Sequence, residues 1–123
     1  MRPRKELVEE AEEAIRKGSK SFAAASTLFD RHTRERVWLL YAWCRRCDDL
    51  ADAQDHGGAL GDQSDAQARL KAIRVLTDRA LEGRPTADPA FDAFGLVAKE
   101  CGITHAMAED VIAGFALDTE GDR

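Results

Sequence analysis

The sequence predicts an all-α protein of about six helices, and three observations support that prediction. Apolar residues recur with the spacing of an α-helix along most of the 123 residues. Signals that start and stop helices, such as Asp88-Pro89 and Cys101-Gly102, separate these periodic segments. No stretch alternates apolar and polar residues as a β-strand does, and no internal repeat or interdomain linker divides the chain. We therefore expect one helical domain.

The first predicted helix is short and ends at a polar junction. It spans about residues 4–17, carries a modest apolar face, and has Gly18 as a candidate C-cap. The segment that follows begins a second helix, and its serines, Ser19 and Ser21, are good N-capping residues on spacing alone. A hydroxyl at such a junction, beside free backbone N–H groups, can also favour a bound anion.

The second helix is short and apolar, and a long central helix follows it. On spacing alone, Phe22 and Phe29 are core residues rather than ligand contacts. A turn and cap over residues 30–33 leads into the central helix, expected over about residues 33–55. The charged residues Arg31, Arg34, Glu35 and Arg36 are expected to form a mostly solvated first turn. The glycine-rich stretch 56–61 then predicts a loop, either a plain surface loop or a flap over the neighbouring aspartates.

Three more helices are expected in the second half of the chain. The first is amphipathic over about residues 65–81. Asp88-Pro89 begins the next, which stops at Cys101-Gly102, and Thr104 caps the last. Gly114 lies within the last helix, where a glycine indicates close packing or the wall of a ligand site. The apolar side of this helix comprises Met107, Val111, Ile112, Phe115 and Ala116.

The central helix is apolar over most of its circumference and carries one polar line. At about 100° per residue, four residues share a narrow stripe, with Arg34 on the same line several turns earlier: Tyr41, Arg45, Asp48 and Asp52. A helix of this kind is normally buried, and charged groups are almost never buried unpaired. We therefore expect the polar line to face a cavity, a ligand or a metal ion.

The acidic part of this line has the spacing D-D-x-x-D, formed by Asp48, Asp49 and Asp52. Carboxylates one turn apart repel each other, and a helix C-terminus adds negative potential, so both effects favour a bound cation. Oxygen ligands suit Mg²⁺ or Mn²⁺, and magnesium is usually held by one or two carboxylates plus substrate phosphates. The pattern fits half of a site that binds a diphosphate together with metal ions, in which Arg45 contacts phosphate. The alternative is a solvated acidic helix end with an Arg45–Asp49 or Arg45–Asp48 surface ion pair.

The composition excludes several classes of protein. A formal net charge of −5 argues against broad nucleic-acid binding, which needs a basic face. No apolar run approaches the roughly 18–20 residues of a membrane span. The basic N-terminus leads directly into four glutamates, so it is not a signal peptide.

Three cysteines indicate a reducing, cytoplasmic setting. Cys44 and Cys47 have C-x-x-C spacing, but no second pair of zinc ligands accompanies them, and redox pairs normally open a helix. The more favoured interpretation is a pair of buried structural cysteines. Cys101 is expected in the core or at a helix end.

Four segments resemble the squalene/phytoene synthase family, most of all the N-terminal part of its bacterial phytoene synthases. They are residues 19–22, 37–45, 48–52 and 111–118, and they occur in the family's order over nearly the whole chain. This likeness is far more specific than D-D-x-x-D alone, which unrelated prenyl-transfer and terpene-cyclising enzymes share.

The resemblance implies an isoprenoid-synthase fold and a Mg²⁺-dependent prenyltransferase of carotenoid biosynthesis. Two geranylgeranyl diphosphates would be joined head to head, through a cyclopropyl diphosphate, to give phytoene. It assigns metal binding to Asp48 and Asp52, with Asp49 a weaker candidate, and places Arg45 and Tyr41 against the diphosphate. It places three residues at the entrance of the pocket: Ser19, Ser21 and Phe22.

The family's second aspartate-rich motif has no counterpart in residues 1–123. The expectation is therefore the N-terminal part of one synthase domain, incomplete for catalysis by itself. Two alternatives stay open: another prenyl-diphosphate enzyme, such as a squalene or dehydrosqualene synthase or a terpene cyclase, and a non-catalytic helical interaction or assembly protein. We expect a cytoplasmic protein with peripheral contact at the inner membrane face, because the implied substrates are very apolar, and no obligate protein partner.

Overall fold

The computed structural model describes residues 2–51 and 63–121, and these residues form six helices without a β-strand. The prediction of an all-α fold is thereby confirmed. The helices are α1 (Arg4–Gly18), α2 (Lys20–Ser26), α3 (Arg31–Ala51), α4 (Gln63–Leu81), α5 (Pro89–Cys101) and α6 (His105–Gly121).

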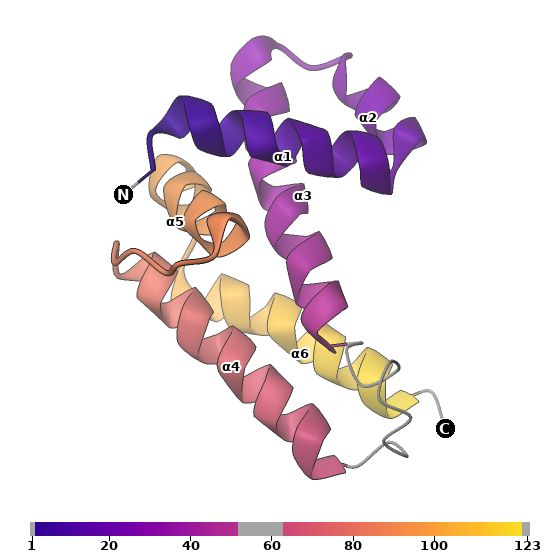
Figure 1. The fold of residues 1–123 in the computed structure, drawn as a ribbon, viewed down its shortest axis with the longest axis vertical. Helices are drawn as coiled ribbons and strands as arrows, with labels where there is room; N and C mark the ends of the chain where they lie inside the picture. Colours follow the sequence, from indigo (N-terminus) through magenta and orange to yellow (C-terminus); the bar gives the residue numbers. More distant parts are fainter. Residues whose placement is uncertain (1, 52–62, 122–123) are drawn as a thin grey trace.

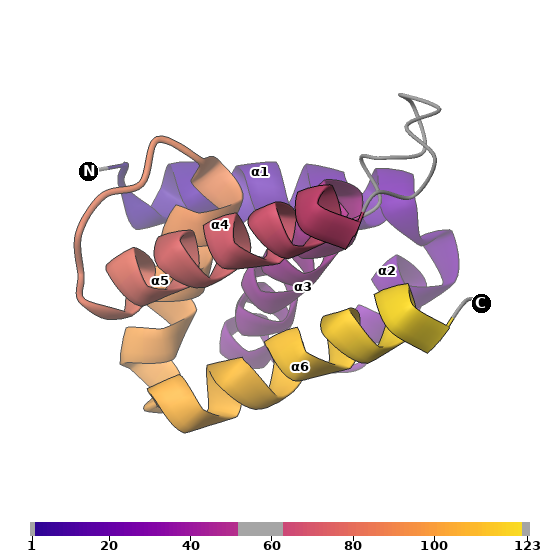
Figure 2. The ribbon, with the colours of Figure 1, turned by 90° about the horizontal axis from the view of Figure 1, so that it is seen from below.

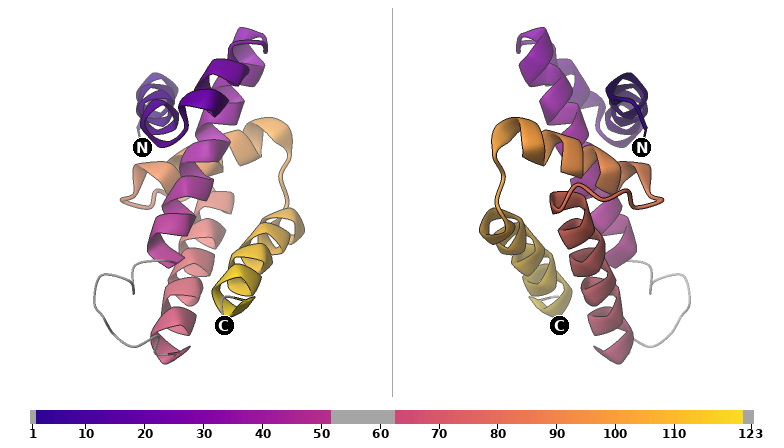
Figure 3. Two further views of the ribbon diagram at one scale, coloured as in Figure 1. Left: turned by 90° about the vertical axis from the view of Figure 1, so that its right-hand side faces the viewer. Right: turned by 90° about the vertical axis from the view of Figure 1, so that its left-hand side faces the viewer.

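The long helix α3 is the element against which most of the others pack (Figure 1). α1 crosses the first half of α3, α5 lies beside both, and α4 packs against α5 and α6. Seen along the length of α3, α1 and α6 lie on opposite sides of the fold (Figure 2), and the side views agree (Figure 3). Among the described helices, α1 and α5 therefore provide most of the packing against α3.

The core is built from the apolar faces that the periodicity predicted for α1, α4 and α5. At its centre the indole of Trp43 stacks on the ring of Phe94, with 4.1 Å between ring centroids and 23° between the planes. Gly95 allows α5 to approach α4, because a Cβ at that position would lie 2.8 Å from the carbonyl oxygen of Ala80. The remaining large buried residues are Leu7, Ile15, Leu39, Leu70, Ile73, Phe91, Val97 and Ile112.

Local capping signals fix several helix ends, as predicted. Ser19 caps α2, where its Oγ accepts a hydrogen bond from the Phe22 backbone N–H at 3.2 Å. Asp88 caps α5 in the same way, and Thr104 caps α6. Asp30 accepts from the Thr33 N–H at 2.8 Å, so α3 begins at Arg31, about two residues earlier than expected.

One prediction about a glycine is wrong, and another is only partly tested. Gly18 is the last residue of α1 and not its C-cap, a position held by Ser19. The absence of a side chain lets the hydroxyl of Tyr41 on α3 lie against this position, where a Cβ would force that side chain to move. Gly114 is predicted to mark close packing or the wall of a ligand site; a Cβ at that position meets none of the described residues within 4 Å, so it does not mark close packing among them, and the ligand wall stays a prediction.

Several apolar residues that were expected in the core are exposed. Phe22 and Phe29 are 44% and 45% exposed, because α2 is only seven residues long and buries only Ser26. On α6 the exposed side includes Met107 and Val111, and the described part of its core face is Ala108 and Ile112. Met107 and Val111 thus lie on a face of α6 that no described helix covers, and Phe29 lies in the turn after α2.

Some predictions fall outside the described residues. They are the end of the central helix near residue 55, the loop over residues 56–61, and the side chain of Asp52. In the described part of the chain, no helix is both long enough and apolar enough to cross a membrane.

Candidate functional site

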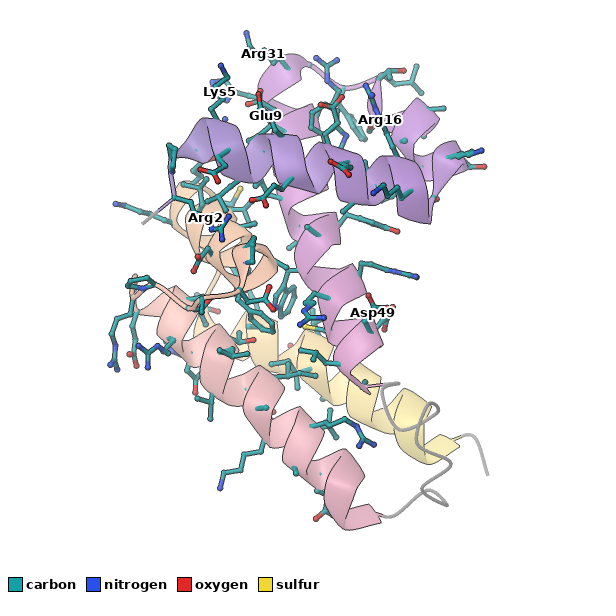
Figure 4. All side chains as sticks on the ribbon, viewed as in Figure 1. Arg2, Lys5, Glu9, Arg16, Arg31 and Asp49 are labelled. Atoms are coloured by element: carbon teal, nitrogen blue, oxygen red, sulfur yellow. The ribbon has the colours of Figure 1, made fainter. Side chains whose placement is uncertain are left out.

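The polar line of α3 lies on the surface of the fold. Arg45, Asp48 and Asp49 are all exposed, and Figure 4 shows Asp49 near the end of α3. Arg45 Nε lies 3.6 Å from Asp49 Oδ1, with side chains 53% and 52% exposed. That this line faces a cavity, a ligand or a metal ion stays a prediction, and the described helices bury mainly the opposite side of α3, around Trp43 and Cys47. The surface ion pair of the alternative interpretation is present.

Tyr41 brings together residues from three helices one turn before Arg45. Its hydroxyl lies against Gly18 at the end of α1, and its ring lies 5.9 Å from that of Phe22 on α2 at an angle of 53°. Ser19 sits at the same junction and caps α2. Three of the residues expected around one pocket, Tyr41, Phe22 and Ser19, therefore meet here, beside the first turn of α2.

Arg34 departs from the polar line on which the helical projection placed it. Its guanidinium lies over the ring of Trp38, 5.7 Å from the ring centroid, at a distance typical of a cation–π contact. The indole N–H of Trp38 in turn donates to Ser26 Oγ at 3.0 Å. Arg34 thus packs toward α2, and Arg45 is the arginine that remains on the line. Ser21, also expected at the pocket, is exposed on α2.

A shallow cavity of about 250 Å³ lies on the other side of Arg45, between α1, α3 and α5. Small apolar side chains, including Ala11 and Ala42, form its floor, and Arg45 and Asp49 lie on its edge. An ion pair between Arg46 Nε and Asp88 Oδ2 at 2.8 Å borders it. Sequence reasoning assigned Asp88 to capping alone, and local spacing carries no signal for a partner 42 residues away.

The described residues do not by themselves complete a metal site, since no three His, Cys, Asp or Glu side chains among them could hold an ion. Cys47 is fully buried and Cys44 is partly buried, and burial raises the pKa of both thiols, in agreement with the structural pair that the sequence favours. Cys101 ends α5 and is exposed.

A second charged cluster, which we call the clamp, joins α1, α3 and α5. Arg4 donates to Glu35 at 2.6 Å and to Glu100 at 2.7 Å, and Arg36 donates to Glu100 at 3.0 Å. Hydrogen bonds from Arg4 lower the pKa of both glutamates and raise that of Arg4. Sequence reasoning assigned the start of α3 to solvent, but the Glu35 side chain is only 12% exposed.

A profile of the squalene/phytoene synthase family matches residues 15–123. A phytoene synthase from Pseudescherichia vulneris is 47% identical over 119 residues, which cover 95% of this chain and 38% of that protein. A 15-cis-phytoene synthase from Pantoea ananas is 44% identical, covering 91% of this chain and 37% of its own length. One from Paracoccus is 41% identical, with 94% and 38% covered. The chain thus spans well under half the length of these relatives.

Proposed function

The chain belongs to the squalene/phytoene synthase family, and we propose that it supplies one wall of the diphosphate site of a phytoene-forming prenyltransferase. The observation that carries this proposal is the meeting of Tyr41, Phe22 and Ser19 beside an exposed arginine and aspartates. An aromatic wall next to a cationic and acidic line suits a ligand with an apolar chain and a charged diphosphate.

The reaction we propose for the whole protein is the head-to-head condensation of two geranylgeranyl diphosphates to phytoene, through a cyclopropyl diphosphate. Each of the two ionisations releases a diphosphate, so the protein must hold negative charge that grows on the leaving group. Arg45 is suited to this role because a guanidinium can bind phosphate oxygens in a bidentate way. The Tyr41 hydroxyl, one turn earlier on the same face, can donate a hydrogen bond to the same group.

Mg²⁺ or Mn²⁺ would be held by Asp48 and Asp52, with Asp49 as a weaker candidate. The donor chemistry fits, because magnesium accepts one or two carboxylates when water and phosphate oxygens complete its coordination. The exposure of Asp48 and Asp49 leaves room for such a ligand. The ion would neutralise charge on the leaving diphosphate. The Arg45–Asp49 pair is a weak surface contact that a diphosphate could replace.

Ser19, Ser21 and Phe22 would form the entrance of this pocket. Ser19 Oγ already accepts a hydrogen bond from the Phe22 N–H, so its own hydroxyl hydrogen remains available to a phosphate oxygen. The exposed ring of Phe22 offers an apolar surface to the first carbons of a prenyl chain. We also propose a cytoplasmic protein that works at the inner membrane face, because its prenyl substrates and product partition into lipid.

The test is thermal unfolding with Mg²⁺, with a non-hydrolysable geranylgeranyl diphosphate analogue, and with both. A ligand at 100 times its dissociation constant stabilises the folded state by about 2.7 kcal/mol. We expect a shift that requires both components and that Asp48→Asn abolishes. Asp110→Asn, which neutralises an exposed aspartate on α6, is the matched control and should keep the shift.

The same titration belongs on a protein that extends over the full length of the relatives. A shift there but not in the 123-residue chain would mean that residues beyond this chain are needed for binding. No shift in either protein would contradict the proposal and favour a helical interaction protein. Analysis of the product of the longer protein would separate phytoene from squalene-type or cyclised products.

A further inference from the structure

Arg45 and Arg46 are adjacent in α3, but their guanidinium groups contact different aspartates. Arg46 Nε donates to Asp88 Oδ2 at 2.8 Å, across to the start of α5. Arg45 Nε lies 3.6 Å from Asp49 Oδ1 on its own helix. Asp49 follows Arg46 by three positions and Arg45 by four, so on a helix it is within reach of either guanidinium. The contact with Asp88 therefore determines which of the two arginines Asp49 meets.

The carboxylate of Asp88 is fixed by the loop that leads into α5. Its Oδ1 accepts a hydrogen bond from the Ala90 N–H at 3.0 Å, and the Asp88 N–H donates to Thr86 Oγ1 at 3.2 Å. Thr86 is buried, and its own N–H donates to Asp92 Oδ1 at 2.8 Å. Between them Ala87 has a φ of 43°, which is strained for a residue with a Cβ. Such strain persists only where the surroundings over-determine the backbone, and it gathers at functional sites.

The charged partners meet on the rim of the shallow cavity between α1, α3 and α5. The rim carries Arg45, Arg46, Glu10, Asp49 and Asp88. Glu10 already has a cationic partner, because Arg2 Nη1 lies 3.3 Å from its Oε2. A guanidinium released from Asp88 would find Asp49 one turn further along its own helix. It would then add positive charge beside the carboxylates proposed to hold Mg²⁺.

We propose that Asp88 is a positioning residue for the diphosphate site, because it holds Arg46 away from Asp49 and so keeps the acidic end of the polar line open to a divalent cation. The inference deepens the proposed function and rests on it. A guanidinium that moves next to a site for a divalent cation weakens the binding of that cation roughly threefold in dilute salt. Capping of α5, the other role of Asp88, has no such effect on cation binding.

The first test is Asp88→Asn. Asparagine is as good an N-cap as aspartate, so α5 should keep its start while the charge that holds Arg46 is lost. The measurement is the Mg²⁺ concentration that gives half of the thermal shift in the presence of the diphosphate analogue. We expect it to rise roughly threefold in Asp88→Asn. The double variant Arg46→Gln/Asp88→Asn should return it to the parent value, because the released guanidinium is gone.

The matched control is Glu10→Gln, which removes a negative charge from the same cavity rim without releasing Arg46. Its Mg²⁺ requirement should equal that of the parent. Circular dichroism should show that each variant keeps its helix content. An equal rise in Glu10→Gln would overturn the inference, because the effect would then belong to the charge of the rim as a whole.

A second measurement follows the position of Arg46 without any ligand. In the parent, the effects of Arg46→Gln and Asp49→Asn on the denaturation midpoint should add, since Arg46 contacts Asp88 instead. In the Asp88→Asn background the two effects should not add, because residues in contact are coupled. Additive effects in both backgrounds would overturn the inference.

The outcomes separate this inference from the proposed function. A Mg²⁺-dependent shift in the parent with the same Mg²⁺ requirement in Asp88→Asn would overturn the role of Asp88 alone. So would a raised requirement that Arg46→Gln does not restore, because that is the result of a damaged cap. A parent without any Mg²⁺-dependent shift, both as this chain and over the full length of the relatives, would contradict the proposed function and this inference with it.

Discussion

The clamp and the polar line are two charged clusters that share helix α3, and their side chains are used in different ways. In the clamp, Arg4 bridges two glutamates at 2.6 and 2.7 Å, and Glu35 and Glu100 are largely shielded from solvent. In the polar line, Arg45 and Asp49 are about half exposed and 3.6 Å apart. A carboxylate with close cationic partners stabilises the fold, whereas one on an open helix face is available to a ligand. Burial and distance, rather than residue type, separate the clamp, whose charges join three helices, from the polar line, for which we propose ligand binding.

The largest predicted change in stability comes from a substitution on the buried side of α3. Trp43→Ala should lower the free energy of unfolding by about 3–5 kcal/mol, because it removes a buried indole and its stack on Phe94. Chemical denaturation would measure the loss. Val75→Ala, at an exposed position on α4, should change stability by no more than about 0.5 kcal/mol. Equal effects of the two substitutions would mean that the Trp43 side of α3 is not the core.

A second prediction compares two glycines in helices. Gly18→Ala should destabilise the protein by about 1–3 kcal/mol, because the new methyl group collides with the Tyr41 hydroxyl. Gly114→Ala should instead stabilise it by about 0.5–1 kcal/mol, since alanine favours the helix and the described surroundings leave space. Thermal unfolding of both variants is the measurement. If Gly18→Ala were also stabilising, Tyr41 would not be fixed against α1.

The clamp predicts a pH dependence of stability. Hydrogen bonds from Arg4 place the pKa of Glu35 and Glu100 below their ordinary value of 4.5. A carboxyl group whose pKa is lower in the folded state contributes stability that is complete above the unfolded-state pKa and is lost as the pH falls through the folded-state pKa. Stability should therefore hold above about pH 5 and decline through the range below pH 4.5.

Glu100→Gln tests this dependence directly. It should cost about 1–2 kcal/mol at neutral pH, because two arginines lose a charged acceptor, and it should flatten the acid decline. Glu109→Gln removes an exposed pair with Arg74 and serves as the control, with little effect at either pH. An unaltered acid profile in Glu100→Gln would assign the decline to other carboxylates.

Features that depend on neighbouring residues were predictable from the sequence, whereas contacts between distant helices were not. Helix ends at Asp30, Asp88 and Thr104 follow from hydrogen bonds within a few residues, so spacing alone could place them to within about two residues. The stripe from Tyr41 to Asp48 follows from the helical repeat in the same way. Packing between segments that are distant in the sequence determines which face of a helix is covered. The local spacing of residues cannot predict that packing.

Three corrections show what local reasoning lacks. Gly18 makes room for Tyr41, 23 positions away, and is not the cap of the helix on which it lies. Glu35 was assigned to a solvated first turn because its partner Arg4 comes from another helix. Phe22 has the spacing of a core residue but is exposed, because α2 is too short to be covered. The family resemblance instead predicts Phe22 at the entrance of a pocket, a prediction that periodicity alone could not make.

The smallest expected change in stability is the one that bears most directly on function. Asp49→Asn removes one partner of an exposed ion pair, so the free energy of unfolding should change by no more than about 0.5 kcal/mol. If the polar line binds a ligand, the same substitution should still weaken the Mg²⁺-dependent thermal shift with the diphosphate analogue. Neutralising a carboxylate then changes binding while stability is preserved, which is the reverse of the result expected for Glu100→Gln. A large loss of stability in Asp49→Asn would instead place the polar line with the clamp as a structural feature.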